Sequence, residues 1–175
     1  MAKKNILARL TGGDRRSIGR ADEVAAIISR DSALFPQLIA GLSSEDPLLA
    51  MRAADAAEKI TRTHPELLQR HKKNLLRLLT TATQQELRWH LAAMVPRLAL
   101  NTKERRAAIA ALKPYLEDGS SIVKTCALQG LADLAEAEPS FRPEITSILR
   151  AALQNGTPAM QARSRKLLPR LRGMP

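Results

Sequence analysis

The feature that most constrains the fold of this chain is a set of helix-breaking positions that recurs at a nearly fixed interval. One set of breakers falls every 37 residues, at His64-Pro65, Asn101-Thr102 and Glu138-Pro139. The helical segments between them align 36, 36 and 37 residues apart, at Met51-Arg52, Leu87-Arg88, Val123-Lys124 and Met160-Gln161. A period of 36–37 residues predicts a row of helix–turn–helix units, each too small to bury a core alone.

The residue content favours helices throughout. The chain holds 27 Leu and 28 Ala but only 3 Val and 4 aromatic residues. Leu and Ala are strong helix formers, whereas β-branched and aromatic residues favour strands. We therefore predict an all-α fold of about four hairpins, preceded by a short helix near Asp22–Ser29. The first helices should span Ala33–Leu42, Pro65–Thr81, Thr102–Glu117 and Phe141–Leu153, and the second helices Pro47–Thr61, Thr83–Leu100, Ser121–Ala137 and Pro158–Leu171.

Residues suited to helix ends stand at several predicted boundaries. Asp46 can cap a helix that has Pro47 at its first position. Thr83 and Glu86 have the spacing of a capping box. Inside the predicted helices, proline removes an amide donor and clashes with the preceding turn, so we expect a kink at two positions, Pro96 and Pro114.

The second helices carry a further pattern. Asp46 precedes Arg52 by six residues, and Asp118 precedes Lys124 by six, each time before an Ala- and Leu-rich helix. With the stretches 51–60 and 122–134, this pattern resembles the HEAT-repeat family over residues 33–171. Ala82 and Asn155 stand where the other two hairpins would carry the Asp. The resemblance implies a right-handed α-α superhelix that acts as a scaffold or adaptor for protein and, less often, for nucleic acid.

Domain organisation and cell compartment follow from simpler features. We predict one repeat domain over residues 21–171, a tail at 172–175, and a basic leader at 1–20 that is either a mobile arm or folds onto the first helices. The only cysteine, Cys126, excludes an internal disulfide and favours a reducing compartment. There is no apolar run of signal-peptide or membrane-span length. We expect a cytoplasmic monomer without membrane contact.

The net charge of +11 is banded along the chain. It is +5 over residues 1–20, +8 over 68–113 and +6 over 145–175, whereas the segments 21–67 and 114–144 each carry −4. Basic bands of this kind suit phosphate groups or acidic proteins.

Two groups of residues are candidates for binding a protein partner. Arg52, Arg88 and Lys124 recur every 36 residues, and either pair with an Asp or a carbonyl of a neighbouring hairpin or form a basic stripe on the concave face. Trp89 lies beside basic groups and either packs in the core or stacks on a partner. The predicted partner-binding set is Arg52, Arg88, Trp89, His90, Arg97 and Lys124.

A second set is predicted to contact phosphate or acidic groups. Two basic pairs should meet on the convex side, Lys72 with Lys73 from one first helix and Arg105 with Arg106 from the next. The last helix adds Arg163, Arg165 and Lys166, with no acid nearby. The alternative is that these charges are solvated, since a terminal repeat needs a polar outer face.

Catalytic patterns are absent from the sequence. There is no cluster with zinc spacing, no phosphate-binding glycine loop and no nucleophile elbow. Cys126 occupies an apolar helix position, which is typical of an inert thiol. We therefore predict a non-enzymatic scaffold with no cofactor, metal or small-molecule substrate. A protein that binds the phosphate backbone of nucleic acid is the alternative.

Overall fold

The computed structural model describes residues 5–14 and 17–172, and all secondary structure in these ranges is helical. The α-helices are α1 (Ala21–Arg30), α2 (Phe35–Gly41), α3 (Pro47–Thr61), α4 (Lys72–Thr81), α5 (Gln85–Met94), α6 (Thr102–Leu112), α7 (Ser121–Ala137), α8 (Arg142–Asn155) and α9 (Pro158–Arg172). Short 3-10 helices are η1 (Leu7–Arg9), η2 (Ser32–Leu34), η3 (Pro65–His71), η4 (Val95–Arg97), η5 (Lys113–Glu117) and η6 (Pro139–Phe141). The predicted all-α class is confirmed.

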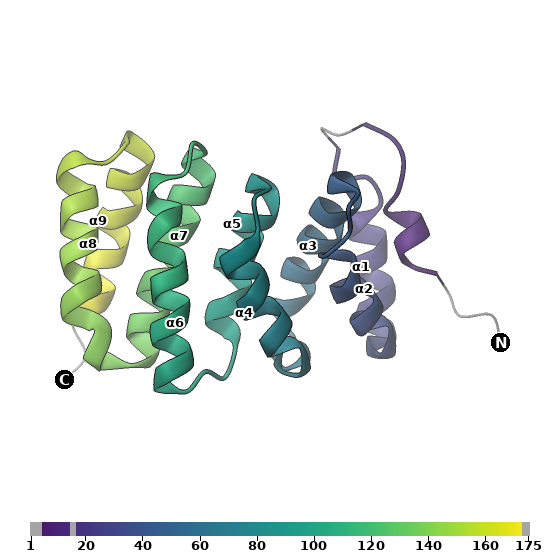
Figure 1. Ribbon diagram of the computed structural model, residues 1–175, viewed down its shortest axis with the longest axis horizontal. Coiled ribbons are helices and arrows are strands. Elements are labelled where there is room, and N and C mark those ends of the chain that lie inside the picture. Colours follow the sequence, from purple (N-terminus) through teal and green to yellow (C-terminus); the bar gives the residue numbers. More distant parts are fainter. Residues whose placement is uncertain (1–4, 15–16, 173–175) are drawn as a thin grey trace.

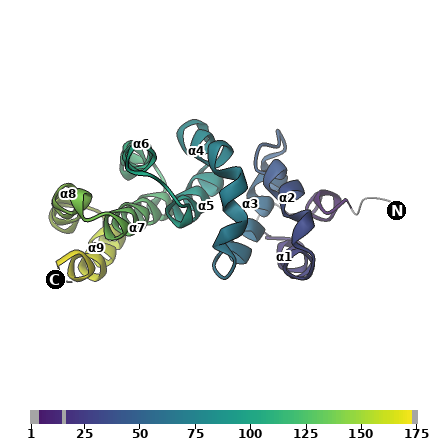
Figure 2. The same cartoon turned by 90° about the horizontal axis from the view of Figure 1, so that it is seen from below.

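The helices form two rows (Figure 1). In the inner row, α1, α3, α5, α7 and α9 each pack against the next. In the outer row, α2, α4, α6 and α8 each pack against the inner helix that follows in the chain. Figure 2 shows that the inner row is bowed, with α1 and α9 displaced to the same side. The row of inner helices is therefore curved, and the outer row covers the side opposite to that toward which α1 and α9 are displaced.

The predicted helix boundaries agree closely with the observed ones in two inner helices. α3 and α7 have the predicted bounds, and the side chain of Asp46 accepts a hydrogen bond from the Leu48 amide at 2.9 Å. The capping box predicted at Thr83 is wrong, because α5 begins after Gln84, whose side chain makes no capping bond. A full capping box instead precedes α6, where Asn101 and Glu104 exchange hydrogen bonds.

The two prolines predicted to kink helices instead end them. α5 stops at Met94 and continues as the 3-10 helix that contains Pro96. α6 stops at Leu112 and continues as the 3-10 helix that contains Pro114. Proline cannot supply the amide that the fourth preceding carbonyl needs, so the chain tightens into 3-10 turns rather than bending a continuous helix.

The core is a continuous layer of Leu, Ala and Ile side chains between the two rows. Leu131 of α7 and Leu91 of α5 are fully buried there. α5 and α7 come so close that a Cβ built on Gly130 would lie 2.6 Å from the carbonyl oxygen of Ala92. Only glycine allows this approach, so Gly130 sets the spacing between two inner helices.

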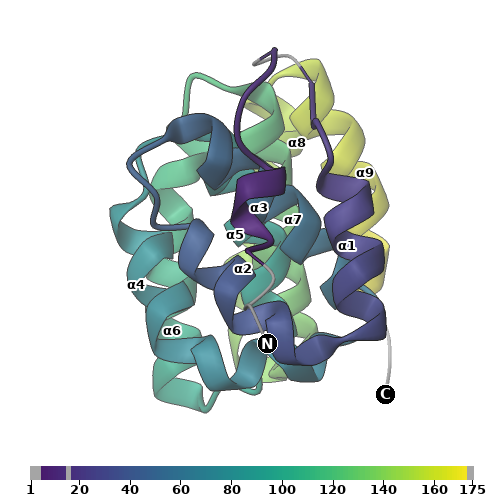
Figure 3. The same ribbon diagram turned by 90° about the vertical axis from the view of Figure 1, so that its right-hand side faces the viewer.

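The described part of the leader folds onto the first helices, as one of the two predicted alternatives requires. Ile6 and Leu10 are buried, and η1 packs against α2. An ion pair joins Arg9 to Glu23 of α1. Figure 3, viewed from the N-terminal end, shows η1 in front of the first helices.

Of the predicted tail, residues 173–175 lie outside the described ranges. None of the helices within those ranges is long and apolar enough to cross a membrane.

Candidate interaction surfaces

Arg52 of α3 is a buried anchor for the leader, with a relative exposure of 2%. Its guanidinium donates hydrogen bonds to four main-chain oxygens, those of Leu10 (2.9 Å), Gly12 (2.5 Å), Asp14 (2.9 Å) and Ser17 (3.1 Å). The guanidinium predicted to face a partner is thus turned inward, because the leader supplies carbonyl acceptors that satisfy most of its donors. With 2% of its surface exposed, Arg52 is not accessible to a partner in this arrangement.

The leader curls tightly to reach Arg52. Gly19 adopts a left-handed φ of 56°, and a Cβ there would lie 2.7 Å from the Cζ atom of Arg52. Any other residue would meet both backbone strain and a steric clash at this point. The sequence around Gly19 is therefore matched to the buried arginine.

Arg88 of α5 links its own hairpin to the next one. Its Nε donates to the Ala82 carbonyl at 2.8 Å, and its Nη1 lies 2.5 Å from the Asp118 carboxylate. The guanidinium also lies over the Tyr115 ring, 5.2 Å from its centre. Burial of Asp118 would raise its pKa, but hydrogen bonds from Ser120 and Arg88, with the nearby charge of Lys124, hold that pKa below its usual value. Two alternatives were predicted for the cations that recur every 36 residues. Arg88 follows the first, since it pairs with an Asp and a carbonyl within the protein.

Arg97, another predicted binding residue, lies in a buried ion-pair cluster with Glu58 of α3. Its guanidinium reaches the Glu58 carboxylate at 2.5 Å and the hydroxyl of Thr61 at 3.0 Å. Arg62 binds the same carboxylate at 2.6 Å. Burial of Glu58 would raise its pKa, but hydrogen bonds from Arg62 and Arg97 outweigh this and lower it. Glu58 has no signal in the sequence except its place in the Ala-rich stretch 51–60, and it was not among the predicted site residues.

Trp89 lines an open groove between the leader and the inner row. The groove has a volume of about 650 Å³ and is walled by Ile18 of the leader, Met51 of α3, and Gln85, Glu86 and Trp89 of α5, with Asp14 and Ser17. Trp89 itself is half-buried against the core. Ile18 is 43% exposed, although it is a large apolar residue. The groove thus offers apolar surface beside the Glu86 carboxylate.

A second exposed apolar residue lies on the next inner helix. Ile122 of α7 is 53% exposed and stands 36 residues after Glu86, at the equivalent point of the next inner helix. Ile18 and Ile122 are the exposed large hydrophobic residues within the described ranges. Neither was singled out from the sequence, because exposure of a single apolar residue leaves no trace in helical periodicity.

His90 and Cys126 are partly buried groups on the inner row. His90 stacks at a tilt on Trp89, with 5.7 Å between ring centres. Burial lowers the pKa of His90, against the opposing charges of Asp55 and Glu58. Burial also raises the pKa of the Cys126 thiol, which keeps it protonated and weakly nucleophilic. The described part of the chain brings together no group of three His, Cys, Asp or Glu that could hold a metal ion.

Three of the seven predicted phosphate contacts are engaged in bonds between hairpins. Lys72 pairs with Glu104 at 2.8 Å, Arg105 with Glu138 at 3.3 Å, and Arg163 with the side-chain oxygen of Gln129 at 3.0 Å. In each bond the partner lies on a neighbouring hairpin. These three side chains hold successive hairpins together, and their charged groups are already bonded within the protein.

The other predicted phosphate contacts point to solvent. Lys73, Arg106, Arg165 and Lys166 are exposed, and none of them has a carboxylate partner within the described ranges. Arg106 lies over the Phe141 ring at 5.3 Å, which fixes its position without neutralising it. Among the predicted partner-binding residues, Lys124 is half-buried near Asp118.

No protein-family model, curated protein or solved structure matches this chain.

Proposed function

We propose that the chain is a HEAT-like, right-handed α-solenoid that acts as a non-enzymatic scaffold, with a protein segment bound on its inner row. The repeat period and the Asp–basic spacing of the second helices motivate the family assignment. The two rows of helices and the bowed inner row support it. Solenoid scaffolds bind their partners on the extended concave surface that the stacked repeats create.

The observation that carries the proposal is the groove between the leader, α3 and α5. It combines an exposed Ile18, a half-buried Trp89 and the carboxylate of Glu86 in about 650 Å³. Aromatic residues in part-buried pockets are the usual anchors of protein interfaces. The best occupant is a protein segment with an apolar side chain for the groove and a basic group for Glu86.

The hydrogen bonds from Arg52 to the leader fix one wall of this groove in place. Four hydrogen bonds to the main-chain oxygens of Leu10, Gly12, Asp14 and Ser17 hold the leader against α3, immediately before Ile18. A wall held in this way needs little ordering when a partner binds, and less ordering means less entropy lost on association. Arg52 therefore acts on binding indirectly, through the leader.

A photo-crosslinking experiment tests this function. A photoreactive amino acid is placed at Met51 in the groove or, as a control, at Ala162, which is exposed on α9. In the source cells, we expect position 51 to capture a defined protein that position 162 does not, and Ile18→Asp to abolish the capture. Equal capture at both positions, or capture that survives Ile18→Asp, would reject the groove as the binding site.

A further inference from the structure

The outer row carries an excess of positive charge that most of the inner row lacks. Its segments, residues 32–41, 65–81, 102–117 and 139–155, hold ten Lys and Arg side chains and four carboxylates. The inner helices α1, α3, α5 with η4, and α7 hold six basic side chains and seven carboxylates. Over these helices the excess of positive charge therefore lies on the outer row, whereas at the far end α9 adds five basic side chains to the inner row.

Three of the four carboxylates of the outer row are already engaged. Glu104 and Glu144 bridge to Lys72 and Lys113 of the preceding hairpins, and Glu66 faces His64. Within the described ranges, the following exposed cations of the outer row form no ion pair with a carboxylate: Arg70, Lys73, Arg77, Lys103, Arg106 and Arg150. Unpaired like charges on one face repel each other, so an anionic partner would stabilise them.

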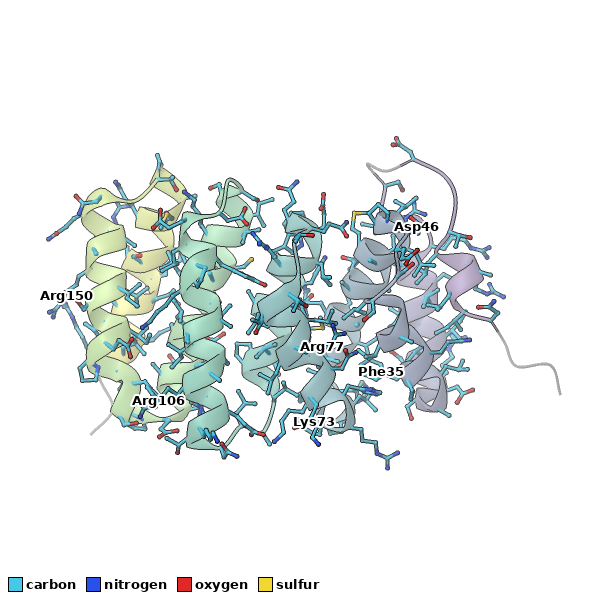
Figure 4. The ribbon with its side chains drawn as sticks, in the orientation of Figure 1. Phe35, Asp46, Lys73, Arg77, Arg106 and Arg150 are labelled. Atoms are coloured by element: carbon cyan, nitrogen blue, oxygen red, sulfur yellow. The ribbon has the colours of Figure 1, made fainter. Side chains whose placement is uncertain are left out.

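These cations follow the repeat at two levels and so form a broad line along the molecule. Arg70 and Arg106 are 36 residues apart. Arg77 and Arg150 are 73 apart, and Lys113, which is paired with Glu144, stands at the equivalent position between them. Figure 4 shows the labelled Lys73 and Arg77 on α4, Arg106 on α6 and Arg150 on α8. With neighbouring helices about 10 Å apart, the line spans roughly 20 Å. One strand of a duplex carries about six phosphates over that length.

A shallow groove between α4 and α6 lies along this line. It has a volume of about 450 Å³, and its walls are mostly small side chains: Thr80, Ala107, Ala110, Ala111 and Pro114, with Arg88 and Tyr115. Arg77 stands one turn before Thr80, and Arg106 directly precedes Ala107, so both arginines belong to the helices that wall the groove, with Arg106 turned toward Phe141 of the next hairpin. Small side chains let a polymer backbone come close enough for both guanidinium groups to reach its phosphates.

We propose that the outer row binds the phosphate backbone of a double-helical nucleic acid through Lys73, Arg77, Arg106 and Arg150. The contact is independent of base sequence, because its groups are cations with no array of side chains to read base edges. It lies on the opposite side from the proposed protein-binding groove, so the solenoid can hold a protein and a nucleic acid at once. Failure of either site leaves the other untouched.

Binding is measured by fluorescence anisotropy with labelled duplex DNA and duplex RNA of about 20 base pairs, at 50 and 200 mM salt. The test variant is Lys73→Gln/Arg77→Gln/Arg106→Gln. The matched control is Arg165→Gln/Lys166→Gln/Arg172→Gln, which removes the same charge from exposed positions of α9. Circular dichroism establishes that both variants are folded, as expected for exposed positions.

We expect the wild type to bind and the outer-row variant to lose about tenfold or more in affinity at 50 mM salt. The slope of log K against log salt should become shallower by about 2.7, since each lost phosphate contact contributes about 0.9. The α9 control should stay within about threefold of the wild type, and Arg77→Lys/Arg106→Lys should keep the wild-type slope. The DNA and RNA arms show which duplex is preferred.

Three results would overturn the proposal. One is the absence of wild-type binding to either duplex at 50 mM salt. Another is an equal loss in the outer-row and α9 variants, which would mean that net charge alone governs binding. The third is binding to vesicles of anionic phospholipid without binding to either duplex, which would assign the face to a membrane surface.

Discussion

Arg97 reaches back 39 residues to bind Glu58, with one nitrogen 2.5 Å from the carboxylate and another 3.0 Å from the Glu58 carbonyl oxygen. Glu58 is 5% exposed, so this carboxylate is held between α3 and the end of α5 by Arg97 and Arg62. Three other ion pairs run in the reverse direction, because Lys72 and Arg105 of the outer row and Arg88 of the inner row bind carboxylates in the following hairpin. Bonds in both directions fix the angle between successive hairpins.

Removal of the Glu58 charge should therefore weaken the fold. We expect Glu58→Gln to lower the free energy of unfolding by about 1–3 kcal/mol, because Arg97 and Arg62 lose a shared buried partner. Arg97→Ala should cost a similar amount, and the double variant less than the sum. Urea unfolding at neutral pH measures all three. Arg170→Ala is the control: its ion pairs with Asp133 and Glu136 are exposed, and it should cost under about 1 kcal/mol.

The ion pair between Glu58 and Arg97 also predicts that the stability of the fold depends on pH. The pKa of Glu58 is lowered in the folded protein, whereas the unfolded carboxyl titrates near about 4.3. The ionised carboxylate thus stabilises the fold fully above the unfolded pKa, and this contribution disappears as the pH falls through the lowered folded value. The stability difference between the wild type and Glu58→Gln should shrink as the pH falls below about 4. A difference that stays constant down to about pH 2 would mean that Glu58 is not held ionised.

Burial of the α7 core face is tested by Leu131→Ala. Leu131 is fully buried where α7 packs between α5 and α9, so its truncation should cost about 2–5 kcal/mol. Ile122→Ala on the same helix is the matched control, because Ile122 is 53% exposed and should cost under about 0.5 kcal/mol. Thermal and urea unfolding compare the two. Similar losses for both variants would contradict the observed orientation of α7.

Gly19→Ala tests whether the hydrogen bonds from Arg52 hold the leader in place. A Cβ at this left-handed position would meet the Arg52 guanidinium, so we expect a loss of about 1–3 kcal/mol and faster hydrogen exchange in residues 5–14. Gly119→Ala is the control, because a Cβ there meets nothing within 4 Å and the backbone is not left-handed. If exchange in residues 5–14 is unchanged in Gly19→Ala, Arg52 does not hold the leader in solution.

The repeat period predicted the helices well because each boundary is a local property. α3 and α7 begin after Asp46 and Ser120, which cap through contacts within a few residues. The repeat period predicts less well which surface side chains are free. Lys72 and Lys73 are adjacent, yet Lys72 is paired with Glu104 and Lys73 is exposed. One residue turns a helical side chain by about 100°, so small rotations of α4 decide which cation is free.

Arg52 shows a second limit of prediction from the sequence. Its spacing from Asp46 matches that of Lys124 from Asp118, which favoured equivalent roles in the two hairpins. The first hairpin, however, is preceded by the leader, whose carbonyls lie 35–42 residues before Arg52. The end unit of a repeat packs against a segment outside the period, so the periodic pattern does not contain its partners. The binding roles of Arg88, Trp89, His90, Arg97 and Lys124 remain predictions.

Tyr115 gives a spectroscopic test of the contact between hairpins. Its hydroxyl donates a hydrogen bond at 2.6 Å to the Leu79 carbonyl, in the preceding outer helix. Burial raises the pKa of Tyr115 to about 12, with a smaller opposing effect from Arg88. Because the phenol is neutral when protonated, it stabilises the fold fully below the unfolded pKa of about 10, and this contribution is lost as the pH rises through 12.

Tyr115 is the only tyrosine in the chain, so the ultraviolet absorbance of phenolate reports on it alone. We expect a midpoint near 12 in the folded protein and near 10 in urea. Tyr115→Phe should cost about 1–2 kcal/mol at neutral pH through the lost hydrogen bond, and the difference from the wild type should vanish at high pH. A midpoint near 10 without urea would show that solvent reaches the phenol. In that case α4 and η5 would not be joined at Leu79, and the line of cations across α4 and α6 would lose its fixed spacing.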